Sequence, residues 1–256
     1  MILSPHIAYC VSLIAYRTSR ITHHVSRHLP FAIRSLFIVS LFIYNCFMSN
    51  VYPSPHPLVA HKLAKLRSID TEPKKFRELI REISMLLAYE ATADLATQPA
   101  PVTTPMGDTT GLELVEKIGL VPILRAGLGM VDGIWEMMPN AEVWHLGLYR
   151  DEKTLKPVQY YNKLPVTPRV GVVLLLDPML ATGGSATAAT QVLKDWGVKN
   201  IIYIGLIAAP EGVQRMQTDH PDVPLYLGAI DSHLNNIGYI VPGLGEFEPT
   251  GNSGYS

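Results

Sequence analysis

The stretch VVLLLDPMLATGGSATAA, residues 172–189, joins an aliphatic segment to one acid, a turn of small residues and the start of a helical pattern. Five aliphatic residues in succession indicate a strand that is buried on both faces, as in a parallel sheet. Asp177 follows this strand directly, and a turn with Gly183 and Gly184 precedes the helical pattern. Open α/β sheets bind their ligands beyond the carboxyl ends of the strands, so we expect a binding site at this turn.

The same turn favours an anionic ligand, above all a phosphate monoester. Gly183 and Gly184 let backbone N–H groups come close to a ligand, and the first turn of a helix adds positive potential. The hydroxyls of Thr182, Ser185 and Thr187 add hydrogen-bond donors. An ordinary strand-to-helix turn capped by Ser185 is the alternative that these residues alone leave open.

The segments around this stretch predict the fold class. From Lys117 onward, short apolar segments alternate with helical patterns, which is typical of an α/β domain whose mainly parallel sheet is flanked by helices. The apolar segments are residues 118–124, 141–149, 170–176, 201–209 and 225–230. After the turn, apolar residues recur at helical spacing, and Gly197 stands where a glycine commonly ends a helix.

A long amphipathic helix is expected ahead of this alternation, within residues 71–95. Its apolar residues have a 3.6-residue period, Thr71 is a candidate N-cap and Pro73 suits the first turn. Residues 97–111 hold three prolines and two glycines, which predicts a loop or a short hairpin. For residues 148–165, which are polar and aromatic, we expect either a projecting β-hairpin arm of the kind that contacts a partner subunit, or a solvated loop.

The composition limits the class of protein. A chain of 256 residues with 48% hydrophobic residues has enough apolar surface for one sizeable domain or two small ones. Its formal net charge of -1 argues against a protein that binds nucleic acid backbones. Both cysteines, Cys10 and Cys46, lie near the N-terminus, so neither a disulfide framework nor a cysteine-ligated metal organises the rest of the chain.

The N-terminal segment, residues 1–51, is expected to be an extension of the functional domain, residues 52–256. Its first fifty residues contain four arginines and no aspartate, glutamate or lysine. Three interpretations stay open: an organelle transit peptide, a membrane anchor, or a dispensable extension ahead of an in-frame start at Met48. The apolar residues 35–48 fall short of the roughly 20 that span a bilayer, which disfavours the anchor. We therefore expect a cytoplasmic protein, with organelle targeting as the alternative.

A second glycine-rich segment, RAGLGMVDG at residues 125–133, follows the apolar segment 118–124. Its glycine spacing misses the dinucleotide-binding fingerprint by one residue, and the chain contains no G-x-x-x-x-G-K-[ST] phosphate loop. The guanidinium of Arg125 offers a planar fork that suits phosphate oxygens. Two anion-binding loops after two strands indicate a ligand with phosphate groups at two ends.

Four segments together resemble the uracil phosphoribosyltransferase family. They are VPILRAGLGM (residues 121–130), GLYRDE (147–152), LLLDPMLATGGSA (174–186) and GYIVPGLG (238–245), and the match runs in order from His56 to Gly245. The resemblance implies a type I phosphoribosyltransferase fold. It also implies transfer of the 5-phosphoribosyl group from 5-phospho-α-D-ribose 1-diphosphate to uracil, which gives UMP and pyrophosphate in pyrimidine salvage.

The resemblance carries further expectations about partners. The family usually needs magnesium, and a homodimer or a higher homo-oligomer and a GTP effector are expected from it as well. Because no cluster of His, Cys, Asp or Glu has metal-ligand spacing, magnesium would be bound mainly through the pyrophosphate and not by a residue set of its own. Neither a nucleic acid nor a membrane is an expected partner.

The resemblance also implies roles for residues of the donor site. Asp177 would hold the ribose hydroxyls and residues 181–185 the 5-phosphate, while Arg125 and Arg150 would contact the pyrophosphate. The implied donor site consists of Arg125, Arg150, Asp177, Pro178, Met179, Leu180, Ala181, Thr182, Gly183, Gly184, Ser185 and Glu246. Arginines and a metal would stabilise the negative charge that develops on the leaving pyrophosphate.

Base selection is implied for residues 238–245 and the two that follow. Backbone groups there would pair with the acceptor–donor–acceptor edge of uracil and reject cytosine and purines, whose edges would leave buried polar groups unpaired. The implied uracil site consists of Tyr239, Ile240, Gly245, Glu246 and Phe247, and the implied catalytic residues are Arg125, Asp177 and Glu246. His145, His220 and His233 are scattered, and we interpret them as surface or core residues.

The family pattern breaks after Gly245. The family has an aspartate and a small residue where this chain has Glu246 and Phe247, through divergence of the C-terminus or an error in the gene prediction. A catalytic group displaced by about 1 Å can lose on the order of 10²-fold in rate, and the benzyl group would occupy space beside the base. Two main hypotheses therefore stand: an active uracil salvage enzyme, or a non-catalytic homologue that binds ribosyl phosphate or nucleotide as a regulator. Transfer to another base is a third.

Overall fold

The computed structural model describes residues 50–150 and 157–245, which belong to one compact unit, Asn50–Ser256. Asn50 belongs to this unit because its carbonyl accepts a hydrogen bond from the N–H of Leu225 (2.8 Å), and Val51 begins a strand. Residues 1–49, which make up nearly all of the expected N-terminal extension, lie outside the described part of the chain.

The core of the unit is a nine-stranded sheet whose main path has the order β1-β11-β10-β8-β4-β6-β7. In that order the strands are Val51–Pro53, Leu225–Ile230, Asn200–Ala208, Val172–Leu176, Ile118–Leu124, Leu146–Arg150 and Pro157–Asn162. All neighbours along the path are parallel except β6 and β7. Two short strands, β5 (Glu142–Val143) and β9 (Met179–Leu180), pair with β4 and β10. The prediction of a mainly parallel sheet is confirmed, and each of the five apolar segments contains a strand.

The direction of chain progression reverses between β4 and β8. The chain continues from β4 toward β6 on one side of the sheet, and from β8 toward β10 on the other side. These two strands pair directly, with Ile118 opposite Val172 and Pro122 opposite Leu176. The loops that follow them therefore flank a topological switch point, which is where open α/β sheets form ligand sites.

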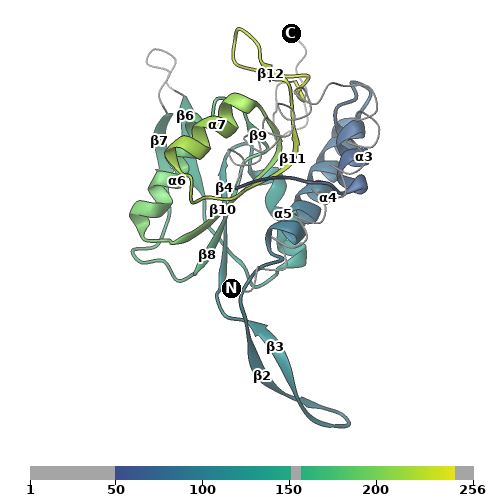
Figure 1. Cartoon of the computed structure of the whole chain (residues 1–256), viewed down its shortest axis with the longest axis vertical. Coiled ribbons are helices and arrows are strands. Elements are labelled where there is room, and N and C mark those ends of the chain that lie inside the picture. Colours follow the sequence, from purple (N-terminus) through teal and green to yellow (C-terminus); the bar gives the residue numbers. More distant parts are fainter. Residues whose placement is uncertain (1–49, 151–156, 246–256) are drawn as a thin grey trace, which may run out of the picture. The chain divides into compact units, whose positions relative to one another are not determined.

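Helices cover both faces of the sheet. Figure 1 shows α3 (Pro57–Leu66), α4 (Pro73–Ala91) and α5 (Leu128–Met137) grouped on one side, and α6 (Gly184–Trp196) and α7 (Pro210–Asp219) on the other. Successive strand residues point to opposite faces, so Leu174 and Leu176 join the hydrophobic cluster of α4 and α5, whereas Val173 and Leu175 point to the α6 side. All four are buried, which explains why β8 is aliphatic throughout.

The predicted helix ends are correct in part. Pro73 is the first residue of α4, but the N-cap is Glu72, and the hydroxyl of Thr71 instead donates to the Lys65 carbonyl (2.5 Å). The N-cap of α6 is Gly183, at a φ of 76°, so Ser185 lies inside the helix and does not cap it. Gly197 ends α6 in the left-handed conformation, as the sequence predicts.

Residues 97–111 form more than the predicted loop or short hairpin. β2 (Thr97–Thr104) and β3 (Gly107–Leu114) pair as a separate antiparallel ribbon that stands away from the main sheet (Figure 1). The prolines are compatible with this ribbon because each of its two strands has an outer edge that needs no hydrogen bonds. Pro99 and Pro101 are two residues apart and so direct their nitrogens toward the same edge of β2.

The hairpin predicted within residues 148–165 is present, and whether it projects as an arm depends on residues outside the described part of the chain. β6 and β7 pair antiparallel at the edge of the main sheet, and their connection, residues 151–156, lies outside the described part of the chain. Among the described elements, the ribbon β2–β3 is the one that stands off the sheet (Figure 1). None of the described helices has the length and apolar character needed to cross a membrane.

Candidate functional site

The loop of residues 177–185 starts at the carboxyl end of β8 and is tied to β10. The N–H of Leu206 donates to the Pro178 carbonyl (3.1 Å), and the N–H of Ala209 donates to the Leu180 carbonyl (2.9 Å). These bonds create the short strand β9 inside the loop. Since the backbone of the loop is paired on one side, its remaining polar groups keep a fixed direction.

The first turn of α7 contacts the same loop at the backbone level. A Cβ atom on Gly212 would lie 2.4 Å from the carbonyl oxygen of Ala181, far inside van der Waals contact. Across the same interface, a Cβ on Gly183 would lie 3.1 Å from the Gly212 carbonyl oxygen. Only glycine allows the two backbones to approach this closely, so Gly212 fixes the position of the loop from outside.

A cavity of about 80 Å³ lies inside this loop and is lined by Asp177 and residues 179–186. The first turn of α6 opens into it, so unpaired N–H groups and the positive end of the helix dipole face the cavity. Thr182 and Ser185 are partly exposed beside it. The combination of small volume, backbone donors and hydroxyls is suited to one tetrahedral anion.

Asp177 is the only ionisable residue in the lining of that cavity. Burial raises the pKa of its carboxyl from 3.8 to about 7, although a hydrogen bond from the Met179 N–H (3.5 Å) opposes the shift. The hydroxyl of Tyr203, a fully buried residue of β10, donates to the Asp177 carbonyl (3.3 Å). No ion pair to another described residue neutralises the carboxylate, so it can accept hydrogen bonds from a ligand.

The second loop follows β4 and touches the end of β8. A Cβ on Gly127 would lie 2.4 Å from the carbonyl oxygen of Leu176, so this contact also requires glycine. The peptide bond between Leu124 and Arg125 is cis. The side chain of Arg125 is exposed and makes no hydrogen bond or ion pair to another described residue, which leaves its guanidinium open to a ligand.

The third loop, residues 238–245, contains the short strand β13 (Ile240–Val241), which pairs antiparallel with β12 (His233–Leu234). Ile240 and Leu244 are buried in the same hydrophobic cluster on which Ala126, Met179 and Ala181 pack. These residues come from the three loops that the sequence singles out. The loops after β4 and β8 and residues 238–245 therefore pack on the same hydrophobic core.

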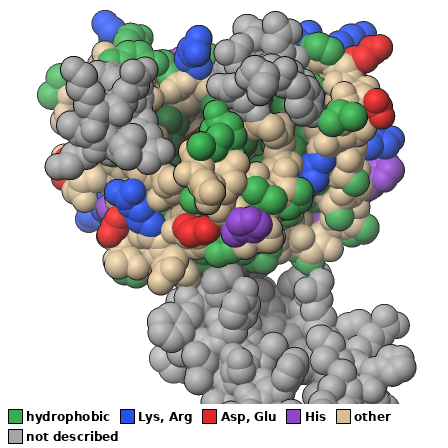
Figure 2. Space-filling view, turned by 90° about the horizontal axis from the view of Figure 1, so that it is seen from above, with side chains coloured by type: hydrophobic (Ala, Val, Ile, Leu, Met, Phe, Trp, Pro, Cys, Tyr) green, Lys and Arg blue, Asp and Glu red, His purple; other side chains and the backbone are tan. Residues whose placement is uncertain are grey.

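The exposed residues of the third loop are Tyr239, Pro242 and Gly245. Tyr239 is half-exposed, and Gly245 is exposed with a φ of 74° and no atom within 4 Å of where its Cβ would be. The peptide bond between Val241 and Pro242 is cis. Figure 2 looks down on the carboxyl ends of the strands, and on the visible described surface the basic side chains are separated by acidic and apolar ones.

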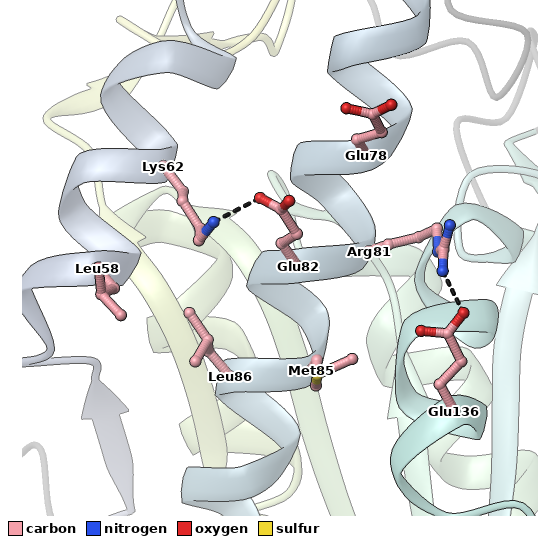
Figure 3. A pocket seen from close by; sticks show the side chains of 8 residues that line it. All are labelled: Leu58, Lys62, Glu78, Arg81, Glu82, Met85, Leu86 and Glu136. Atoms are coloured by element: carbon pink, nitrogen blue, oxygen red, sulfur yellow. Dashed lines mark hydrogen bonds and ion pairs between the residues drawn. The ribbon is translucent and has the colours of Figure 1, made fainter.

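A larger pocket of about 410 Å³ lies between α3, α4 and α5 and contains none of these loops. Figure 3 shows its two cations pointing toward carboxylates: Lys62 pairs with Glu82 (2.5 Å), and Arg81 pairs with Glu136. With both cations neutralised by carboxylates, this pocket is a poor site for a phosphate. The site at the switch point remains the better candidate despite its smaller volume.

Comparison with known proteins agrees with this geometry. A model of the family described as uracil phosphoribosyltransferase matches residues 53–249. The chain belongs to this family. The match spans all three loops and includes the positions of Glu246 and Phe247. The resemblance by sequence motifs, in contrast, ends at Gly245.

Individual relatives in the uracil phosphoribosyltransferase family cover nearly the same part of the chain. The uracil phosphoribosyltransferase of Roseiflexus sp. (strain RS-1) is 62% identical over 199 residues, which is 78% of this chain and 96% of the relative. That of Acholeplasma laidlawii is 56% identical over 191 residues, which is 75% of this chain and 92% of the relative. Among solved structures, the AQ2163 protein of Aquifex aeolicus superimposes with a TM-score of 0.74 at 36% identity, over 79% of this chain and 98% of that one.

The structure brings together most of the residues expected for the donor site of this family. Residues 177–185 form one loop, and Arg125 lies in the loop next to it. Arg150 ends β6, on the far side of β4 from β8, but its side chain lies outside the described residues. Glu246 and Phe247 also lie outside them, whereas Tyr239, Ile240 and Gly245 form part of the third loop.

Of the three histidines, His145 is partly exposed, and His220 is buried with its Nε2 atom 3.1 Å from the Thr187 carbonyl oxygen. His233 is exposed beside Ser232. None of the three lines the cavity of the 177–185 loop.

Four residues that support the site were not predicted from the sequence. Tyr203 and Gly212 hold the 177–185 loop, and Arg67 and Asp231 hold residues 238–245. Gly212 could have been suspected, since a glycine in the first turn of a helix is unfavourable unless close contact requires it. Arg67 and Asp231 are 164 positions apart, so no local pattern could have paired them.

Proposed function

We propose that the chain catalyses uracil salvage: it transfers the 5-phosphoribosyl group from 5-phospho-α-D-ribose 1-diphosphate to uracil and releases UMP and pyrophosphate. The observation that carries this function is that the 177–185 loop and the Arg125 loop flank the switch point and that residues 238–245 pack on the same core. The family match over nearly the full length of the relatives supports the same reaction. The chain is thus a pentosyl-transferring enzyme.

The 177–185 loop is proposed to hold the phosphoribosyl group. The 5-phosphate would lie in the cavity of about 80 Å³, where it would accept hydrogen bonds from backbone N–H groups at the start of α6 and from the hydroxyls of Thr182 and Ser185. Asp177 lies at the opposite end of the loop, after β8, and would accept hydrogen bonds from the ribose hydroxyls. In this arrangement the loop recognises the sugar phosphate and leaves the base to other residues.

Arg125 and Arg150 are proposed to face the pyrophosphate. Breaking the bond between ribose and pyrophosphate moves negative charge to the leaving group, and a guanidinium stabilises it through paired hydrogen bonds. The side chain of Arg125, which is exposed and has no partner among the described residues, fits this role. Arg150 is proposed for the same role because it is the last residue of β6, the strand next to β4.

Magnesium is proposed to arrive with the pyrophosphate. No three His, Cys, Asp or Glu side chains gather as a metal site in the described residues. An ion held mainly by substrate oxygens and water would need no such set, and Asp177 is the carboxylate that lines the donor cavity. When bound there, the ion would neutralise charge on the leaving group. Asp177 itself would orient the ribose.

Uracil is proposed to bind against residues 238–245. Backbone groups at Ile240 and Gly245, and at the two residues that follow, would pair with its acceptor–donor–acceptor edge. The core cluster buries Ile240 and so keeps this part of the loop in place. A base with a different edge would leave buried backbone groups unpaired, so cytosine and purines are expected to be rejected.

The alternative of a non-catalytic regulator is not favoured. It depended on Glu246 and Phe247, and the family match continues past both positions to residue 249. The relatives at 52–62% identity all bear the name of the enzyme. The intact loops around Arg125 and Asp177 agree with an enzyme.

The direct test of this function is the formation of UMP from labelled uracil by the purified chain, with 5-phosphoribosyl diphosphate and magnesium. We expect UMP with uracil and none with cytosine. A Glu246→Asp, Phe247→Ala double variant is the matched control for the C-terminal departure, and it should be at least as active as the natural chain. UMP from the double variant alone, or from neither protein, would refute an active enzyme.

Assembly, regulation and location are expectations that follow from the family. We propose a homodimer or a higher homo-oligomer, activation by GTP, and a cytoplasmic location, with organelle targeting by residues 1–50 as the alternative. Sedimentation analysis, an activity titration with GTP and the distribution of a fluorescent fusion test these three points in turn.

A further inference from the structure

The loop proposed to recognise uracil has little regular structure of its own. Residues 238–245 are supported by β12 and β13, which are two residues each and pair only with one another. Two-stranded pairs of this length do not hold a fixed conformation in water. Beyond the hydrogen bonds of Ser232 and Asn235 within this hairpin, contacts that hold the loop must therefore come from other elements.

An ion pair between distant parts of the chain reaches this loop. Arg67 caps the C-terminus of α3, and Asp231 follows the last residue of β11. The Nη2 atom of Arg67 donates to Oδ1 of Asp231 (2.6 Å), and Nη1 donates to Oδ2 (2.8 Å). This is the bidentate geometry in which a guanidinium binds a carboxylate most strongly.

Both members of the pair also bind Gly243, in the middle of the loop. Nη1 of Arg67 donates to the Gly243 carbonyl (3.0 Å), and Oδ2 of Asp231 accepts from the Gly243 N–H (2.9 Å). The two backbone polar groups of Gly243 are thus both satisfied by side chains. Gly243 has a φ of 66°, and a Cβ there would lie 2.2 Å from the Ile240 carbonyl oxygen, so the turn is closed tightly at this residue.

The pair is shielded from water. The Asp231 side chain is 5% exposed and that of Arg67 is 22% exposed. An ion pair between well-exposed side chains contributes little, but a shielded one with further hydrogen bonds holds its partners in one geometry. Removing either member would leave the other charge poorly solvated and would release Gly243.

We propose that Arg67 and Asp231 are positioning residues that set the geometry of the uracil-reading loop and thereby the affinity and selectivity for the base. Gly243 lies between Ile240 and Gly245, so a shift at Gly243 moves both of the groups proposed to pair with uracil. Neither side chain needs to touch the base. The donor loop is held by other contacts, at Tyr203 and Gly212, so the effect should fall on uracil and spare the donor. This inference rests on the proposed function.

The test compares Arg67→Met, which keeps the aliphatic stem but removes the guanidinium, with Lys194→Met as the matched control. Lys194 also forms a 2.6 Å ion pair, with Asp222, but this pair lies between α6 and the segment after α7. For Arg67→Met we expect the KM for uracil to rise by about tenfold to a hundredfold, with the KM for the donor within about twofold of the natural chain. Lys194→Met should change neither.

Two more variants keep the test decisive if Arg67→Met folds poorly. Asp231→Asn preserves shape but removes the charge, and it should raise the KM for uracil in the same selective way. Arg67→Lys keeps a positive charge but cannot donate to both Asp231 oxygens and Gly243 at once, so its effect should be intermediate. Equal changes in both KM values, or none in either, would overturn a positioning role.

Hydrogen exchange provides a readout that does not depend on catalysis. In the natural chain the Gly243 amide should be protected, and in Arg67→Met it should exchange faster while amides of β10 keep their protection. Unchanged protection of Gly243 would overturn the inference even if the enzyme is active. If the natural chain forms no UMP, the proposed function is refuted. The exchange rate of the Gly243 amide would still show whether the Arg67–Asp231 pair holds the loop.

Discussion

Asp177 illustrates how one residue can serve function at a cost in stability. It stands between an aliphatic strand and a loop, and burial raises the pKa of its carboxyl to about 7. A group whose pKa is raised on folding binds a proton more tightly in the folded chain than in the unfolded one. Its contribution to stability is therefore greatest near and below pH 3.8, its ordinary pKa, and declines as the pH rises to about 7.

Because the pKa of Asp177 is raised on folding, the variant Asp177→Asn should change stability in a pH-dependent way. The amide stays neutral at every pH, so the variant should have a higher Tm than the natural chain at about pH 8, and the gain should vanish near pH 4. Its rate of UMP formation should fall at least about 100-fold, because the amide is a weaker acceptor for ribose hydroxyls. Thermal unfolding at both pH values, together with the UMP assay, checks this. A lower Tm of the variant at pH 8 would show instead that the folded chain stabilises the ionised carboxylate through other contacts.

At the scale of elements, the site depends on backbone contacts between neighbours. α7 approaches the donor loop at Gly212, and the loop after β4 approaches β8 at Gly127. At both glycines one backbone lies directly against another. A backbone cannot move aside as a side chain can, so a larger residue would displace the neighbouring element. Substitutions in α7 at residues that contact no ligand are therefore expected to shift the donor loop.

Gly212→Ala tests this dependence. The new methyl would lie 2.4 Å from the Ala181 carbonyl oxygen, so the loop or the helix has to shift. We expect a loss of about 1–3 kcal/mol of unfolding free energy and a higher KM for the donor, with the KM for uracil changed less. Gln214→Ala, on the exposed side of the same helix, is the control and should behave like the natural chain. An unchanged donor KM in Gly212→Ala would show that α7 does not set the loop.

The elements differ in how well the sequence predicts them, for physical reasons. β8 was predictable because burial on both faces demands an unbroken aliphatic segment, and α4 because one face alone is buried. β1 is three residues long and contains Pro53, and α3 begins inside the same proline-rich segment, so neither has a clear pattern. The length of the ribbon β2–β3 was missed because prolines that break a central strand are tolerated at free edges.

At the scale of the whole molecule, the topology brings the loops after β4 and β8 together. β4 and β8 are neighbours from which the chain departs in opposite directions, and their loops open at the same edge of the sheet. The glycine-rich stretches after these strands were recognisable from sequence because each carries its own pattern. The Arg67–Asp231 pair was not, because its members become neighbours only when α3 packs beside β11.

One ligand is expected to bridge the loop after β8 and residues 238–245. A crystal structure of the chain with bound UMP tests it most directly. We predict the phosphate among the backbone N–H groups of residues 181–185, the ribose hydroxyls on Asp177 and the edge of uracil on backbone groups of Ile240 and Gly245. A nucleotide whose phosphate lies elsewhere, such as in the pocket between α3, α4 and α5, or whose base does not reach residues 238–245, would contradict the account.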